Sequence, residues 1–376
     1  SRSSAASDVY KRQFVAMPCV KEVLAAGQTK GSVRVELPDG GRMQVDLRVV
    51  SRKSFGAAMQ YFTGSKEHNI RLRELAVKKG LKLNEYGLFD GARQVAGRDE
   101  EGIYRHLGLP LIPPDLREDR GEIEVADRLP KLIEITDLRG DLHLHTPASD
   151  GRDSIEDLAA AAKKLGYQYI AAADHSKSEV IAHGLSIEAM RAHIEALRET
   201  ARRIKGVEVL VSTEVDILAD GTLDYPDEIL ADCDIVTASI HTGLSQERSK
   251  TTARTIAAMR SPHVHILGHP TGRLLGQREA MDLDMDAVIR AAVETGTALE
   301  VNAAWQRLDL CDRHIRQAVE AGATLVISTD AHSVEQMIEY MPYGITTARR
   351  GWAAKEHVLN TRPLAEIRKF VASKRR

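Results

Sequence analysis

Cysteine is scarce in this chain of 376 residues, and long apolar runs are absent from it. The three cysteines, Cys19, Cys233 and Cys311, lie far apart and form neither a disulfide framework nor a paired metal-binding motif, which fits a reducing cytosol. No apolar run approaches the roughly 20 residues that a membrane-spanning helix needs. The start of the chain also lacks the basic and then apolar layout of a secretory signal. The composition therefore indicates a cytoplasmic globular protein with room for two or three domains.

Charge is nearly balanced over the whole chain, with a formal net value of −2, but it is unevenly distributed. Residues 14–110 carry 16 Lys and Arg against 11 Asp and Glu, whereas residues 137–355 carry 23 against 33. The acidic stretch also holds many of the 14 histidines, a combination that favours bound cations. The basic flank is compatible with a phosphate-rich partner, although an ordinary solvated surface has similar charges.

The N-terminal third predicts the end of one domain and a small following domain, both within residues 14–110. Residues 1–13 have no hydrophobic pattern and resemble translated adapter sequence, so we expect them to be disordered and not native. In residues 14–110, VRVELPDG followed by GRMQVDLRVV predicts a β-hairpin, and KEHNIRLRELAVKKG predicts a helix closed by glycine. Residues 111–136, rich in proline and charge, are expected to form a linker to a last domain at residues 137–376.

Short apolar runs alternate with helical patterns through the rest of the chain. The seven runs are residues 141–145, 169–175, 207–215, 234–241, 263–269, 297–303 and 324–332. Repeated strand–helix units predict parallel strands joined by crossover helices. We therefore expect an α/β fold, either a barrel of seven units, one fewer than in the eight-unit TIM type, or an open doubly wound sheet. A dinucleotide-binding fold is not supported, because no GxGxxG motif follows the first run.

Six of the seven runs end, or nearly end, in side chains of the kind that bind metals. The C-terminal ends of parallel barrel strands open on one face, so these side chains are expected to meet there. The nine candidates are His143, His145, Asp150, His175, Glu214, His241, His269, Asp330 and His332. One histidine after a strand is usually structural, but nine ligand-type residues at equivalent positions predict a metal cluster. Imidazole and carboxylate donors without thiolate suit Mn²⁺, Zn²⁺ or Fe²⁺ and do not distinguish among them.

These residues also carry a family resemblance. GDLHLHTPASDG, AAADHS, STEVDI, SIHTG, LGHPTGRLL and STDAHS resemble the motifs of the PHP (polymerase and histidinol phosphatase) family, in the order found in bacterial family X DNA polymerases. The resemblance implies a distorted seven-stranded barrel with three divalent metal ions. The implied ligand sets are His143, His145, Glu214 and Asp330 for the first ion, Glu214, His241 and His269 for the second, and Asp150, His175 and His332 for the third.

The upstream part carries a second resemblance. VDLRVV, YFTGSKEHN and LNEYGLF resemble the end of the palm and the thumb of family X polymerases. The implied polymerase residues are Asp46 as third catalytic carboxylate, Tyr61, Phe62, Gly64 and Asn69 in the nucleotide pocket, and Arg73 near the template groove. The D-x-D pair that such a site needs has no counterpart before Asp46. We therefore expect a C-terminal portion of a longer protein, without polymerase activity.

The combined resemblance implies metal-dependent phosphodiester hydrolysis at DNA 3′ ends, a 3′→5′ exonuclease activity, with 3′-phosphatase or abasic-site cleavage as further activities. The implied catalytic residues are Glu214 as a bridge between two metals, with His143, His145, Asp330, His241, His269 and Arg273 around it. Arg307 is a second candidate for a phosphate contact. Two alternatives stay open: a small-molecule phosphatase of the histidinol-phosphate type and a non-catalytic DNA-binding module.

Overall fold

The protein is described from a computed structural model that covers residues 9–375 except residues 11, 28 and 39. The chain divides into two compact units, one up to Leu129 and the other from Pro130 onward. None of the described helices combines the length and the apolarity that a bilayer crossing requires.

The first unit is built on two three-stranded antiparallel sheets, β1-β2-β3 and β4-β5-β6. Its elements are β1 (Val20–Ala26), β2 (Lys30–Glu36), β3 (Arg42–Arg48), α2 (Phe55–Thr63), α3 (Lys66–Lys78), β4 (Lys82–Asn84), β5 (Gly87–Asp90), β6 (Arg93–Ala96) and α4 (Glu100–His106). The predicted hairpin is β2 paired with β3, and the predicted helix is α3, so both predictions are confirmed. The α2 helix ends at Gly64, whose positive φ of 75° suits glycine.

Four described residues of the N-terminal tail are helical, where the sequence predicts disorder. Residues 9–10 and 12–15 are helical, whereas residues 1–8 and 11, which were expected to be disordered, lie outside the described residues. The Phe14 ring lies against Gly31 of β2, where a Cβ atom would stand 3.2 Å from it. Phe14, the first residue after the tail, therefore packs on this sheet.

The part of the first unit beyond α4 is held against its helices by buried polar groups. Arg117 donates a 2.6 Å hydrogen bond to Glu100, and its guanidinium lies 5.2 Å from the centre of the Tyr104 ring. The Glu122 carboxylate lies 2.6 Å from Nδ1 of His68, whose Nε2 lies 2.8 Å from the Tyr104 hydroxyl. Much of the stretch expected to be a linker is therefore bound to the helices of this unit.

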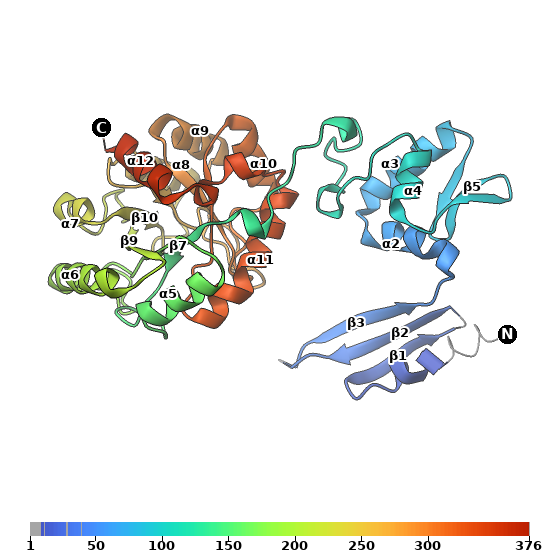
Figure 1. Cartoon of the computed structure of the whole chain (residues 1–376), viewed down its shortest axis with the longest axis horizontal. Helices are drawn as coiled ribbons and strands as arrows, with labels where there is room; N and C mark the ends of the chain where they lie inside the picture. The colour runs from blue at the N-terminus through green and yellow to red at the C-terminus, as the bar shows by residue number, and fades with distance from the viewer. Residues whose placement is uncertain (1–8, 11, 28, 39, 376) are drawn as a thin grey trace. The chain divides into compact units, whose positions relative to one another are not determined.

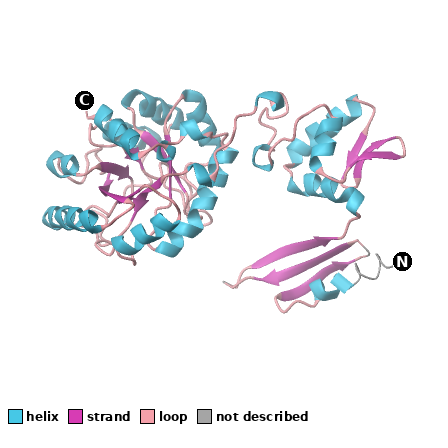
Figure 2. Ribbon diagram, viewed as in Figure 1, coloured by secondary structure: helices cyan, strands magenta, loops and turns pink. Residues whose placement is uncertain are grey.

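The second unit is a barrel of seven parallel strands surrounded by helices (Figures 1 and 2). Its elements are β7 (Gly140–Leu144), α5 (Ile155–Lys164), β8 (Tyr169–Ala172), α6 (Ile187–Arg203), β9 (Glu208–Asp216), α7 (Asp227–Asp232), β10 (Ile235–Ser239), α8 (Arg248–Met259), β11 (Ile266–Leu267), α9 (Met285–Thr295), β12 (Ala298–Asn302), α10 (Asp312–Ala321), β13 (Leu325–Ser328), α11 (Val334–Arg350) and α12 (Leu364–Lys374). The strands follow one another in chain order and each neighbouring pair is parallel. The seven-unit barrel is thus confirmed over the open sheet.

Side chains close the seam between the first and the last strand of the barrel. Among the residues that the structure describes, one backbone bridge, between Leu144 and Ala331, links the two strand regions. The buried side chain of Asn360 lies nearer the N-terminal ends of the two strands. Its amide NH₂ donates to the carbonyls of Gly140 (2.7 Å) and Ile327 (2.8 Å). Its amide oxygen accepts from the Ile327 N–H (3.1 Å). One amide side chain therefore replaces the backbone pairing that is missing at this position.

We predict that Asn360→Ala lowers the free energy of unfolding of the barrel by about 3–5 kcal/mol. The change leaves two buried carbonyls and one buried N–H group without partners, and each such group costs about 1–3 kcal/mol. Urea denaturation with an unchanged m-value measures the effect. Gln317→Ala, which removes an exposed amide on α10, is the matched control and should stay within about 0.5 kcal/mol of wild type.

The barrel interior changes from apolar to polar along each strand. On β9, Leu210 belongs to the apolar cluster that fills the lower barrel, and Ser212, Glu214 and Asp216 follow it at intervals of two. The alternate residues of β9 pack outward against the helices. This period of two places the polar groups in the upper barrel, at the C-terminal ends of the strands.

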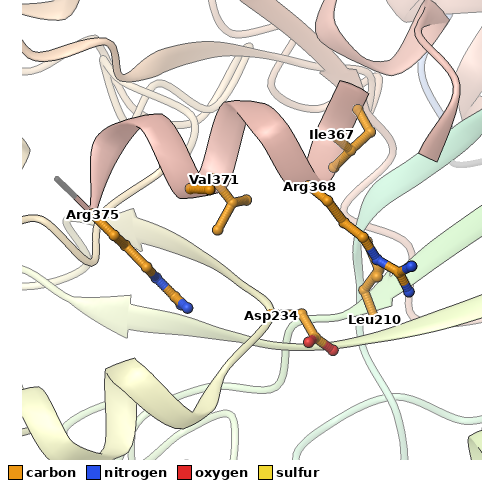
Figure 3. A pocket seen from close by; sticks show the side chains of 7 residues that line it. Leu210, Asp234, Ile367, Arg368, Val371 and Arg375 are labelled. Atoms are coloured by element: carbon orange, nitrogen blue, oxygen red, sulfur yellow. The ribbon is translucent and has the colours of Figure 1, made fainter. Parts of the chain in front are cut away.

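The opposite end of the barrel is covered by α12. Ile367 and Val371 of this helix join the apolar cluster inside the strands. A cavity of about 440 Å³ remains beside them, between α12 and the N-terminal ends of β9 and β10, where Leu210 and Asp234 lie (Figure 3). Because this cavity lies at the N-terminal ends of the strands, it is separate from the candidate metal ligands.

Candidate metal centre

The structure brings all nine predicted metal ligands together at the C-terminal ends of the strands. They form three overlapping groups whose potential ligand atoms lie within 4.8 Å of one another. The groups are His143, His145, Glu214 and Asp330; His145, Asp150, His175 and His332; and His175, Glu214 and His241. The ninth residue, His269, places Nε2 at 2.9 Å from the Glu214 carboxylate.

Glu214 lies at the centre of this cluster, with five imidazoles around its carboxylate. The distances from its oxygens are 2.9 Å to His269, 3.0 Å to His175, 3.4 Å to His143, 3.4 Å to His241 and 3.8 Å to His145. The two oxygens face different imidazoles: Oε1 faces His241 and His269, and Oε2 faces the other three. This arrangement suits a carboxylate that bridges two cations.

Local backbone irregularities aim several of these ligands. A register shift between Asp141 and Leu144 interrupts the pairing of β7 with β8, and a bulge of this kind re-aims a side chain. His269 and Asp330 adopt positive φ values of 23° and 54°, which are uncommon for residues other than glycine. Positive φ in non-glycine residues is concentrated at functional sites, because the surrounding structure must enforce it.

Several buried polar atoms of the cluster form no hydrogen bond of normal geometry, although some lie close to another polar atom. They are Nε2 of His143, Nδ1 of His145, Nδ1 of His175, both ring nitrogens of His269 and both carboxylate oxygens of Glu214. Native interiors rarely leave buried polar groups unsatisfied, and bound ions are one accepted reason. The residues present therefore fit a centre that binds divalent cations through imidazole and carboxylate donors.

The electrostatics of the cluster favour charged carboxylates. Burial raises the pKa of Glu214, but His143, His241 and His175 outweigh burial and hold it well below its usual value. Burial lowers the pKa of His143, but Glu300, Glu214 and Asp330 outweigh burial and hold it well above its usual value. The site therefore strongly attracts positive charge. Protonated imidazoles provide this charge when no metal ion is bound.

A second group of carboxylates orients the imidazoles. Glu300 of β12 lies 2.7 Å from Nδ1 of His143 and accepts a 2.6 Å hydrogen bond from the His269 N–H. Asp216 of β9 lies 2.5 Å from Nδ1 of His241. Carboxylates in this position fix the tautomer of a metal-bound histidine and leave Nε2 free for the metal.

A third such carboxylate, Asp174, holds the loop after β7. It accepts hydrogen bonds from the Thr146 N–H (2.9 Å), the Thr146 hydroxyl (2.8 Å) and the Ser149 hydroxyl (2.7 Å). His193 of α6 lies 2.8 Å from it on the other side. Because Asp150 follows Ser149 directly, this network positions one of the candidate ligands.

Reasoning from the sequence did not single out Glu300, Asp216 or Asp174, although a signal for two of them is present. Asp216 lies two residues after Glu214 on one strand, and Glu300 lies two residues after the inward-facing Ala298. Both therefore share the inner face of the barrel with the ligands. The prediction rests on residues at or near the ends of the apolar runs, whereas Glu300 lies in the middle of the run at residues 297–303 and Asp216 lies just beyond the run at residues 207–215.

The two arginines that are candidates for phosphate contact have different partners in the structure. Nε of Arg307 lies 3.4 Å from the Asp330 carboxylate, so this guanidinium reaches the edge of the cluster. Arg273 instead donates to the carbonyls of Arg307 (2.8 Å) and Leu308. In this structure Arg273 therefore braces the loop that carries Arg307.

We predict that Glu300→Gln weakens metal binding about 10- to 100-fold. The amide keeps the shape of Glu300 but removes the negative charge beside His143 and one of the acceptor oxygens. Titration with Mn²⁺, followed by calorimetry, measures the change. Glu294→Gln, an exposed position on α9, serves as the control and should bind Mn²⁺ as wild type does; equal weakening in both variants would contradict the orienting role.

The residues that resemble a polymerase site lie in the first unit. Asn69 ties the α2–α3 junction together, because it donates to the Tyr61 carbonyl (2.7 Å) and accepts from Gln60 (2.5 Å). The Phe62 ring lies edge-on to Tyr61, with centroids 5.1 Å apart, and Gly64 ends α2 next to them.

The other two residues of that proposed site are exposed or partly exposed. Asp46 projects from β3, where hydrogen bonds from Ser32, Gln44 and Lys30 lower its pKa to about 2. Arg73 lies on α3 and is half-buried. None of these residues belongs to the histidine cluster of the barrel unit.

Comparison with known proteins identifies the class that this barrel and its cluster define. Residues 141–304 match the PHP domain family model, and residues 58–118 match the DNA polymerase beta thumb model. The chain belongs to the PHP family. A probable phosphatase of Shewanella sp. (strain MR-4) is 32% identical over 202 residues, which cover 51% of this chain and 75% of that relative.

One relative matches both units. DNA polymerase/3′-5′ exonuclease PolX of Bacillus subtilis (strain 168) is 41% identical over 363 residues, or 96% of this chain, which confirms the resemblance to bacterial family X polymerases. This chain spans 63% of the length of that relative. A solved structure of Leishmania infantum polymerase beta, in a ternary gap complex, covers 31% of this chain and 51% of its own at 26% identity, but its TM-score of 0.28 is too low to support a conclusion.

Proposed function

We propose that this chain is a metal-dependent phosphoesterase that hydrolyses phosphodiester bonds at the 3′ ends of DNA. The observation that carries the proposal is the carboxylate of Glu214 among five imidazoles, with unpartnered ligand atoms, at the C-terminal ends of the strands of a PHP barrel. In a parallel barrel this face is where active sites are built.

The proposed cofactors are three divalent ions, Mn²⁺, Zn²⁺ or Fe²⁺. His143, His145, Glu214 and Asp330 would hold the first, Glu214, His241 and His269 the second, and Asp150, His175 and His332 the third. When bound, such ions lower the pKa of a water molecule and neutralise negative charge on phosphate oxygens. The overlap of the groups through His145 and His175 supports a compact centre rather than three separate sites.

The protein's own residues position the reaction. Glu214 would belong to both central ligand sets, and Glu300 and Asp216 orient the ring nitrogens of His143 and His241. Arg307 would donate a charge-assisted hydrogen bond to a non-bridging phosphate oxygen, and Arg273 would fix its loop. Preorganised positive groups of this kind stabilise the negative charge that develops on the phosphate.

DNA is the proposed substrate because of the first unit. That unit matches a polymerase thumb model, and the relative that covers both units is named a polymerase and 3′-5′ exonuclease. We propose that Asp46, Tyr61, Phe62, Gly64, Asn69 and Arg73 contribute to nucleotide and DNA binding. Residues 14–110 carry a net charge of +5, the difference between 16 basic and 11 acidic residues, which favours contacts with DNA phosphates.

A small-molecule phosphatase is the second candidate. Probable phosphatases, among them one of Thermoanaerobacter sp. (strain X514) that is 29% identical over 247 residues, match the barrel at lower identity than PolX. That match covers 63% of this chain, whereas the match to PolX covers 96%.

Incubation of the Mn²⁺-loaded chain with a 5′-labelled primer–template separates these functions. The proposal predicts a ladder of progressively shortened labelled strands. Hydrolysis confined to phosphomonoester metabolites would favour the phosphatase instead. Retention of DNA without any shortening would indicate a binding module and would refute the enzymatic proposal.

A further inference from the structure

One tryptophan lies exposed on the loop that also carries Arg307. The chain has two tryptophans. Trp352 is 5% exposed, and the guanidinium of Arg316 lies 3.6 Å from the centre of its ring. Trp305, in contrast, is 50% exposed. A large indole left half in water gains little from burial in the fold, and tryptophan is enriched where proteins bind ligands.

The loop that carries Trp305 has a fixed position. It follows β12 and is closed at its base by a 2.6 Å hydrogen bond from the Asn302 N–H to the Asp309 carbonyl. A turn within it is formed by the Leu308 N–H and the Ala304 carbonyl, at 2.9 Å. Arg273 braces it from a neighbouring loop, as described above. The indole is therefore presented on a rigid support, which reduces the entropy lost when a ligand packs on it.

This loop also reaches the metal centre. Arg307, two residues after Trp305, places Nε at 3.4 Å from the Asp330 carboxylate. Two residues of chain span at most roughly 7 Å. The Trp305 backbone therefore lies within roughly 7 Å of the backbone of Arg307, the residue whose side chain reaches the cluster.

We infer that Trp305 is a stacking platform for the nucleobase next to the phosphodiester that occupies the metal centre. The inference rests on the proposed phosphodiesterase function and names a residue that determines how the substrate is held. Stacking of a base on an aromatic ring tolerates every base, because each has a flat apolar face. Trp305 would therefore strengthen binding without selecting a sequence.

Kinetics on three oligonucleotides that differ by one base test whether Trp305 stacks on a nucleobase. The substrates are a 5′-labelled oligonucleotide with an intact 3′ end and two versions that lack one base, at the last or at the penultimate position. Trp305→Ala should raise KM about tenfold on the intact strand, and Trp305→Phe should restore most of the loss. The effect of Trp305→Ala should vanish on the strand that lacks the stacked base, because enzyme and substrate changes remove the same contact.

Leu165→Ala is the matched control, because Leu165 is an exposed apolar residue at the C-terminal end of α5, on the opposite end of the barrel. It should leave KM unchanged on every substrate. If Trp305→Ala raises KM equally on all three strands, or not at all, the platform is overturned while the phosphodiesterase function stands. If the wild-type protein cleaves none of them, the proposed function itself fails.

Fluorescence gives a readout that does not depend on turnover. A phosphorothioate oligonucleotide, added to the Mn²⁺-loaded protein, should quench the emission of the exposed Trp305, because a stacked base takes the place of water on the ring. Trp305→Phe should remove this quenching and leave the emission of the buried Trp352. Quenching of equal size in Trp305→Phe would overturn the inference.

Discussion

Glu214→Gln should lower kcat for phosphodiester hydrolysis by about 10³-fold or more. The variant keeps the size of the side chain but loses the charge that two central ligand sets share. Cations contribute several kcal/mol to such reactions, and each 1.36 kcal/mol corresponds to a tenfold change in rate. Steady-state kinetics in saturating Mn²⁺ measure the change, and circular dichroism checks that the barrel remains folded.

Asp150→Asn is the informative comparison for this variant. Asp150 lies 3.1 Å from Nε2 of His332 and contributes only to the outer group of ligands. Its replacement should therefore cost less activity than the replacement of Glu214. Equal losses in the two variants, or a milder loss at Glu214, would show that Glu214 does not bridge the central ligand sets.

Removal of the metal ions should lower the melting temperature of the barrel unit by about 5–10 °C. An ion present at 100 times its dissociation constant stabilises the fold by about 2.7 kcal/mol, and 1 kcal/mol shifts the melting temperature of a domain of this size by about 2–4 °C. Calorimetry before and after treatment with EDTA measures the shift, and added Mn²⁺ should reverse it. In Glu214→Gln the shift should shrink, because fewer ions bind.

The stabilisation of the barrel by Mn²⁺ should depend on pH in a defined way. Burial lowers the pKa of His241, but Glu214 and Asp216 outweigh burial and raise it to about 9 in the metal-free protein. An incoming cation must displace that proton, so the apparent metal affinity should rise with pH until the pKa of His241 is passed. A stabilisation by Mn²⁺ that is independent of pH would contradict the assignment of His241 as a ligand.

Much of the barrel and the cluster is predictable from the sequence, because both follow from strands that alternate with helices. Each apolar run became a strand, and parallel strands in a barrel bring their C-terminal ends to one face. Residues as far apart as His143 and Asp330 therefore meet without any local signal that links them.

Other features depend on contacts that no sequence pattern reveals. Asn360 lies in a short 3-10 turn, and its part in closing the barrel follows only from the gap between β7 and β13. Arg273 contacts the loop after β12, whereas Arg307 reaches the cluster. This difference depends on how two loops meet, since both arginines follow strands and both carry the same charge. The packing of residues beyond α4 on the first unit rests on buried partners such as Glu122 and His68.

The number of metal ions bound per chain tests the central claim most directly. Elemental analysis of the Mn²⁺-reconstituted protein, after removal of free metal, should find about three ions per chain in the wild type and fewer in Glu214→Gln. The same protein with no bound metal after reconstitution would contradict the assignment of the nine-residue cluster as a metal centre.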